Sequence, residues 1–175
     1  MKLFFVTSLM SAGLVFSALG ASDEQSNGTL KLGDSIPAVT AKDQKGQDVN
    51  LRENNTGYTL VYFYPKAMTA GCTAQACSLR DSYTQLQDKG VKVFGVSVDT
   101  IDAQKEFADK NHLPFELLSD PDKKVIGAFG VPLFKNAYAS RQAYLFKDGK
   151  LIWFDVKAST DAQAADVLKV LARPS

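Results

Sequence analysis

An uninterrupted apolar run at residues 59–64, Thr-Leu-Val-Tyr-Phe-Tyr, limits the possible folds of this chain more than any other feature. Aromatic and β-branched residues without polar alternation are typical of a strand buried on both faces, and Pro65 ends the run. A second run of this kind covers residues 91–98. Between them, apolar residues recur at helical spacing over residues 71–89, and Gly90 marks the end of that helix. The order strand, helix, strand predicts two parallel strands joined by a right-handed crossover.

The remaining patterns extend this arrangement into a complete domain. Helical spacing predicts three more helices, at residues 103–111, from Asp120 or Asp122 to Gly127, and at residues 161–172, where Ala165, Leu168 and Leu171 are expected to be buried. Strand-like runs predict a hairpin at residues 37–51, a short strand at 115–118, and a hairpin of residues 142–146 and 150–156 around Asp148-Gly149. We therefore expect an α/β, thioredoxin-like fold: a central mixed β-sheet flanked by helices, with an N-terminal β-hairpin.

The first 20 residues have the composition of a secretory signal peptide. They carry one charge, at Lys2, followed by an apolar stretch over residues 3–16 and small residues at Ala18 and Gly20. The apolar stretch is shorter than the roughly 20 residues that span a bilayer. We expect a signal peptide at 1–20, a linker at 21–29 and one domain at 30–173. The mature protein should be exported to a bacterial periplasm and should not associate with the membrane after cleavage.

Charge and composition argue against several classes of function. The chain has 20 Lys and Arg residues and 19 Asp and Glu residues, without a basic block that would attract nucleic acid. One histidine and two cysteines cannot supply the four ligands of a structural zinc site. The sequence thus predicts no nucleic-acid partner, no metal and no cofactor.

Cys72 lies where the first buried strand passes into its helix. The first turn of a helix presents unpaired N–H groups and a partial positive charge, which favour the nucleophilic thiolate form of a cysteine. Thr69 lies three residues upstream, where its hydroxyl can point at the sulfur, at an oxygen bound beside it, or at the helix backbone as a cap. Cys72 is therefore the first candidate for a reactive residue.

The second cysteine, Cys77, lies in the same predicted helix. In a regular helix a spacing of five residues places the two Cα atoms roughly 8 to 9 Å apart, whereas a disulfide needs less than about 7 Å. A bond between Cys72 and Cys77 would then form only after that turn unwinds, as in a redox switch. On the sequence alone a permanent structural disulfide, common in exported proteins, and metal binding by the two sulfurs stay open as alternatives.

The pattern P-x-x-x-T-x-x-C, formed by Pro65, Thr69 and Cys72, resembles the active-site motif of the peroxiredoxins. The placement of Cys77 is similar to that in the bacterioferritin comigratory protein or PrxQ subfamily. Further segments that resemble this subfamily are 63–66, 77–81, 95–99, 113–115, 118–120 and 128–131, so the resemblance extends over about residues 30–171. One departure is Ala70, where the subfamily more often has proline.

The resemblance implies a role for each residue of the motif. Cys72 would be the peroxidatic cysteine that attacks a hydroperoxide and becomes a sulfenic acid, and Cys77 would resolve it as an intramolecular disulfide. Thr69 would orient the peroxide, Pro65 would shape the loop and keep water out, and Arg141 would stabilise negative charge. Arg141 is chosen because Ser-Arg-Gln at residues 140–142 opens a strand, as in the family.

The resemblance also implies the partners of the protein. We expect an antioxidant, thioredoxin-dependent peroxidase acting on hydrogen peroxide and small organic hydroperoxides, reduced by a thioredoxin-like protein and monomeric in solution. An exported thiol-disulfide oxidoreductase acting on protein thiols is the alternative function, although such enzymes usually carry C-x-x-C. A binding module with a structural disulfide is a third possibility.

Overall fold

The computed structural model describes residues 29–53 and 56–173. Its main sheet has seven strands in the order β2-β1-β5-β4-β3-β8-β9. These strands are β1 (Thr40–Asp43), β2 (Asp48–Asn50), β3 (Tyr58–Phe63), β4 (Val91–Ser97), β5 (Glu116–Ser119), β8 (Gln142–Lys147) and β9 (Lys150–Asp155). The central strands β3, β4 and β5 are parallel to one another, and every other pairing is antiparallel. This arrangement confirms the predicted mixed sheet.

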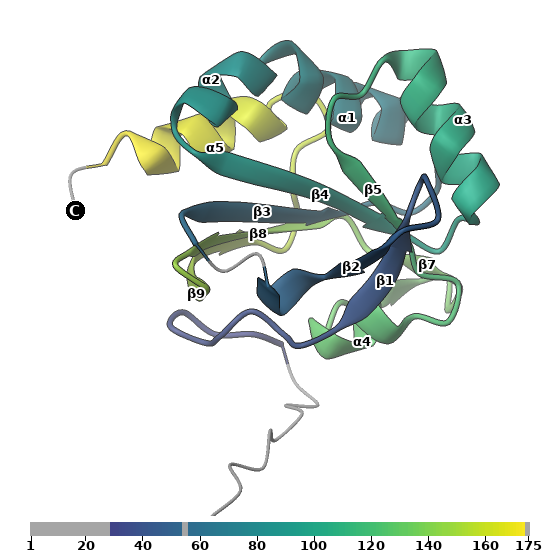
Figure 1. Cartoon of the computed structure of the whole chain (residues 1–175), viewed down its shortest axis with the longest axis horizontal. Coiled ribbons are helices and arrows are strands. Elements are labelled where there is room, and N and C mark those ends of the chain that lie inside the picture. The colour runs from purple at the N-terminus through teal and green to yellow at the C-terminus, as the bar shows by residue number, and fades with distance from the viewer. Residues whose placement is uncertain (1–28, 54–55, 174–175) are drawn as a thin grey trace, which may run out of the picture.

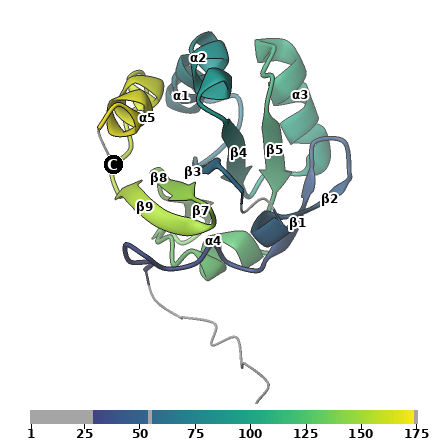
Figure 2. The same cartoon turned by 60° about the vertical axis from the view of Figure 1, so that its left-hand side comes forward.

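The helices divide unequally between the two faces of the sheet (Figures 1 and 2). One face carries α1 (Ala70–Asp81), α2 (Tyr83–Asp88), α3 (Ile101–Asn111) and α5 (Gln163–Leu171), whereas α4 (Lys124–Ala128) lies on the other. The single-turn 3₁₀ helix η1 (Leu51–Glu53) follows β2. The predicted α/β layout with helices on both faces is thus confirmed.

The central strand β3 separates two hydrophobic clusters. Leu60, Tyr62 and the following Tyr64 belong to the cluster beneath α1, α2, α3 and α5. Val61 and Phe63 belong to the cluster on the α4 side. Every residue of β3 after Tyr58 is buried, as the unbroken apolar run predicts for a strand covered on both faces.

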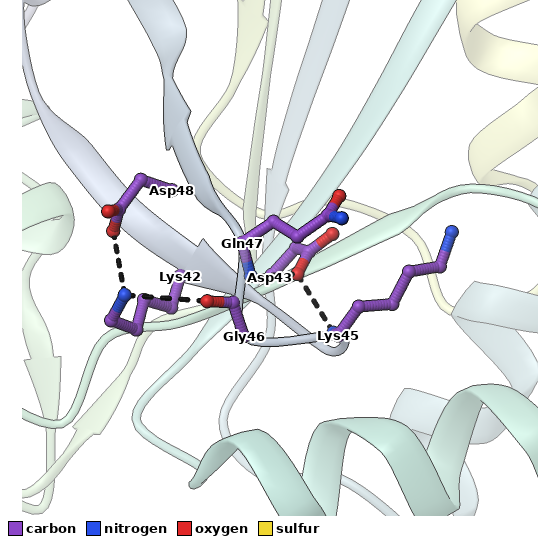
Figure 3. A network of polar contacts seen from close by, with 6 residues as sticks. All are labelled: Lys42, Asp43, Lys45, Gly46, Gln47 and Asp48. Carbon is purple, nitrogen blue, oxygen red and sulfur yellow. Dashed lines mark hydrogen bonds and ion pairs between the residues drawn. The ribbon is translucent and has the colours of Figure 1, made fainter.

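The N-terminal hairpin lies at one edge of the sheet, as predicted. The buried Asp43 carboxylate accepts hydrogen bonds from the backbone N–H groups of Lys45 and Gln47, both at 2.8 Å (Figure 3). This side-chain turn, together with Gly46 at a φ of 78°, reverses the chain between β1 and β2. Asp148 and Gly149 also have positive φ values, of 48° and 74°, and connect β8 to β9 as the sequence predicts.

Several details of the sequence prediction are wrong. The helix expected from Asp120 or Asp122 to Gly127 begins only at Lys124 and ends at Ala128, although the Asp120 carboxylate accepts hydrogen bonds from the N–H groups of Lys124 and Ile126. The helix expected over 71–89 is two helices, because the backbone of Ser82, at φ −106° and ψ 11°, leaves the helical region between α1 and α2. A small second sheet, β6 (Leu133–Phe134) and β7 (Tyr138–Ala139), was not predicted. Helix α5 begins later than expected and buries Gln163, Ala164 and Val167, while Ala165 is exposed and Leu168 and Leu171 are half-buried.

The expected signal peptide and all but the last residue of the expected linker lie outside the described residues. Within residues 29–53 and 56–173, no helix combines the length and apolar character that crossing a bilayer requires.

Candidate active site

Cys72 is the third residue of α1 and only 1% exposed. The chain reaches it from the end of β3 through a loop that is fixed at both ends. The backbone N–H of Tyr64 donates to the Val96 carbonyl at 3.1 Å, and that of Ala67 donates to Asp99 Oδ2 at 2.7 Å. Met68 then adopts a left-handed φ of 63°, which turns the chain into the helix. The sequence prediction of a cysteine in the first turn of the helix that follows a buried strand is therefore confirmed.

Arg141 contacts the sulfur directly. Its Nη2 donates to Cys72 Sγ at 3.4 Å. The contact is possible because Arg141 immediately precedes β8, which pairs with β3, so that the start of β8 lies beside the end of the strand leading to Cys72. The sequence motif alone could not place this arginine beside the cysteine, and the structure does.

Gly71 leaves the space that this guanidinium occupies. A Cβ atom at residue 71 would lie 3.3 Å from Arg141 Nη2 and 3.5 Å from Thr160 Cγ2. A contact of 3.3 Å is tighter than most Cβ atoms make, so a side chain at residue 71 would require the guanidinium to shift by a few tenths of an ångström. Glycine here therefore lets the guanidinium approach α1 closely.

Gln75 is a residue of the site that the sequence analysis missed. It is fully buried on the face of α1 that carries Cys72, and its Oε1 accepts a hydrogen bond from Arg141 Nη1. Its Nε2 donates to Gln163 Oε1 at 2.9 Å, so that the arginine is connected to α5. The available signal was a polar residue three positions after Cys72, on the core-facing side of the helix.

Thr69 occupies the N-cap position of α1 without capping it. Its hydroxyl donates to the Lys66 carbonyl at 2.9 Å, and its side chain accepts no hydrogen bond from the helix. The cap suggested from the sequence is therefore wrong, because the hydroxyl turns back to the preceding loop. Pro65 is half-buried at the start of that loop. The roles expected of these two residues toward peroxide stay predictions.

Cys77 lies in the same helix as Cys72, half-buried, and the two sulfurs are not bonded to each other. Because both residues lie in one continuous helix, the condition under which the sequence analysis expected a redox switch is met. The turn between residues 72 and 77 must unwind before a disulfide can form.

Tyr62 belongs to the same cluster of buried residues as Cys72. Its ring is fully buried, and its hydroxyl has no hydrogen-bond partner among the described residues. Burial raises the pKa of Tyr62 well above its ordinary value, and the charges of Tyr64 and Cys72 raise it further. Tyr62 therefore stays a neutral phenol beneath the reactive helix.

The described residues contain no group of three or more histidine, cysteine, aspartate or glutamate side chains that could hold a metal ion. What the site does hold is a buried sulfur in the first turn of a helix, contacted by a guanidinium. A guanidinium in this position can donate hydrogen bonds to an atom on which negative charge develops as it reacts with the sulfur.

Comparisons with known proteins agree with this chemistry. The model of the AhpC/TSA family matches residues 32–154. The chain is 38% identical to peroxiredoxin bcp1 of Schizosaccharomyces pombe, over 82% of this chain and 74% of that protein. It is 50% identical over 102 residues to peroxiredoxin Bcp of Escherichia coli, an alignment that covers 58% of this chain and 65% of the relative.

Solved structures of peroxiredoxins have a fold similar to that of this chain. The peroxidoxin BcpB of Mycobacterium tuberculosis superposes with a TM-score of 0.75 at 29% identity, covering 83% of this chain and 99% of that one. The peroxiredoxin Q of Xanthomonas campestris superposes with a TM-score of 0.73 at 25% identity, covering 83% and 96%.

Proposed function

This chain belongs to the AhpC/TSA family and is a thiol peroxidase, and we propose that it reduces hydrogen peroxide and small organic hydroperoxides at Cys72. The observation that carries the proposal is the 3.4 Å contact between Arg141 Nη2 and the buried Cys72 Sγ at the start of α1. A guanidinium at this distance can stabilise the negative charge that develops on a departing oxygen when the sulfur attacks a peroxide.

In the first step the Cys72 thiolate attacks one oxygen of the hydroperoxide. A sulfur–oxygen bond forms as the oxygen–oxygen bond breaks, and the second oxygen takes up a proton and leaves as water or an alcohol. Sulfur is oxidised to a sulfenic acid and the peroxide is reduced by two electrons. Arg141 stabilises the negative charge on the attacking sulfur and on the departing oxygen. Thr69 orients the peroxide, and Pro65 helps to exclude water.

In the second step Cys77 resolves the sulfenic acid. Its thiolate attacks the Cys72 sulfur, the sulfur–oxygen bond breaks, and the hydroxyl group takes up a proton and leaves as water while the intramolecular disulfide forms. A dithiol protein of the thioredoxin type then reduces this disulfide, becomes a disulfide itself and restores both cysteines. Both reactive sulfurs lie in α1, so the second step needs the unwinding described above.

The cellular setting of this reaction is also part of the proposal. Residues 1–20 support export to a bacterial periplasm, where the reductant must be one delivered outside the cytoplasm. We expect the mature protein to be a monomer. Mass spectrometry of the periplasmic fraction should find an N-terminus close to residue 21, and sedimentation should give the mass of one chain; an unprocessed chain in the cytoplasm would contradict the export proposal.

The peroxidase proposal is tested by mixing the reduced protein with one equivalent of hydrogen peroxide in a stopped-flow instrument. Loss of free thiols and Trp153 fluorescence report the reaction. Both thiols should disappear far faster than free cysteine reacts. Cys72→Ser should abolish the reaction, whereas Cys77→Ser should allow one turnover and then accumulate sulfenic acid. Thiol loss no faster than in free cysteine, or full activity in Cys72→Ser, would make the proposal wrong.

A further inference from the structure

The first turn of α5 holds the segment of α1 that carries Cys77. Gln163 Oε1 accepts from Gln75 Nε2 at 2.9 Å, and the backbone N–H of Ala164 donates to Ser78 Oγ at 3.2 Å. Gln75 lies two residues before Cys77 and Ser78 directly follows it. Both α5 contacts therefore act on the turn that must move when the disulfide forms.

The chemistry of the arginine fixes the direction of this hydrogen-bond chain. A guanidinium only donates, so the Gln75 carbonyl oxygen faces Arg141 and the Gln75 amide nitrogen must face Gln163. The Gln163 oxygen then accepts, and its own Nε2 has no partner among the described residues. Gln163 is fully buried. Within the described part of the chain, its side chain makes one hydrogen bond, to Gln75.

Gln75 lies between the two cysteines in the sequence and is fully buried. Unwinding of the whole segment between Cys72 and Cys77 would pull Gln75 away from both Gln163 and Arg141. In the unwound state water can hydrogen-bond to the Gln75 amide, whereas in the helix its partners among the described residues are Gln163 and Arg141. The bond to Gln163 thus favours the wound state over the unwound one.

We infer that Gln163 is a positioning residue that acts through Gln75 to keep α1 wound, and that it thereby limits the rate at which Cys77 resolves the oxidised Cys72. This inference rests on the proposed function. The C-terminal helix would then control the second step, in which Cys77 attacks the oxidised Cys72. The first step, the reaction of Cys72 with peroxide, should be unaffected because Arg141 contacts the sulfur directly and not through Gln163.

The test follows the two steps separately in single-turnover experiments. The rate of the first phase rises with peroxide concentration, and the rate of the second does not. Gln163→Leu leaves the Gln75 amide without its acceptor in the wound state only, so the second phase should become about five- to tenfold faster. The first phase should change less than twofold, and excess peroxide should produce less sulfinic acid at Cys72.

Two further variants keep the inference testable even if Gln163→Leu folds poorly. Ser78→Ala removes the acceptor of the second α5 contact and should accelerate the same phase. Gln44→Leu is the matched control, because Gln44 is a buried glutamine that bonds to the backbone of Phe115 and Leu117, away from α1. It should leave both phases unchanged.

The inference is overturned if Gln163→Leu and Ser78→Ala leave the second phase within twofold of the unaltered protein, or slow it. It is also overturned if Gln163→Leu slows the first phase, because Gln163 would then act on peroxide through Arg141. Failure of the proposed function has a different signature, since the unaltered protein itself would show no phase that depends on peroxide.

Discussion

Two regions on opposite faces of the central sheet differ in their contacts: the surroundings of Cys72 and the cluster of rings around Phe129. On the reactive face, Cys72 shares a buried site with the polar side chains of Gln75, Gln163 and Arg141. On the opposite face, a cluster of aromatic rings packs around Phe129, with ring centroids 5.1 Å from Phe63, 5.4 Å from Tyr144 and 6.0 Å from Phe146.

This difference separates stability from reactivity. Aromatic packing is distributed over many weak contacts, so that face has no single bond whose loss would open it. Around Cys72, apolar packing is joined by a few directional hydrogen bonds that connect α1 to Arg141 and to α5, and each of these bonds can be released on its own. A helix that must unwind during every catalytic cycle is better attached in the second way. Four substitutions test this division.

Phe129→Ala should have the largest effect, and it should fall on stability alone. Removing a fully buried ring should lower the free energy of unfolding by about 3 to 5 kcal/mol. The rate constant of the first phase, measured at a temperature where the variant is folded, should change less than twofold. Urea unfolding and stopped-flow kinetics give the two values. A parallel loss of reactivity would show that the two faces are not independent.

Arg141→Ala should have the reverse effect. Loss of the guanidinium should lower the second-order rate constant with hydrogen peroxide by on the order of a hundredfold, which corresponds to about 3 kcal/mol. Arg141→Lys is the control, because it keeps the charge but cannot bond to Gln75 and Cys72 together through two nitrogens. A change below twofold in the alanine variant would mean that another residue stabilises the charge.

Tyr62→Phe should stabilise the protein by up to about 1 kcal/mol, because it removes a buried hydroxyl without a partner among the described residues. The difference in the free energy of unfolding between Tyr62→Phe and the unaltered protein should increase above pH 10. The pKa of Tyr62 is raised in the folded state, so the unfolded chain releases its proton first and stability is lost as the pH rises past the unfolded value. Urea unfolding at pH 7 and pH 10.5 would measure both effects. Destabilisation at pH 7 would contradict the prediction.

Ala70→Pro should have the smallest effect. Residue 70 is the first residue of α1, where proline fits, and the extended backbone of Thr69 suits a residue that precedes proline. We expect a gain of less than about 1 kcal/mol and a first-phase rate within twofold. Thermal unfolding and the same kinetics would check both. A large loss of rate would show that the start of the reactive helix needs the freedom that alanine gives.

The sequence predicted those parts of the molecule that local chemistry determines. The unbroken run of β3 could only be a strand covered on both faces, and Asp148-Gly149 could only favour a tight hairpin. The proximity of Arg141 to Cys72 follows from the pairing of β8 with β3, which the strand patterns do not specify. The family resemblance supplied that residue, and the geometry places it beside the sulfur.

The features that were missed depend on contacts between distant segments. Gln75 and Gln163 are 88 residues apart, and each is an ordinary polar residue until the other is beside it. Just beyond the backbone break at Ser82, Tyr83 lies against Phe115 at a ring distance of 5.7 Å. No window of local sequence contains either contact.

The absence of a side chain at Gly71 also affects how this site can change by mutation. Every substitution there adds atoms, and the first atom added already meets the guanidinium at 3.3 Å. A substitution at residue 71 would therefore require Arg141 to shift by a few tenths of an ångström. Among sequences with this fold, we expect such substitutions to lower the rate of reaction with peroxide rather than to unfold the chain.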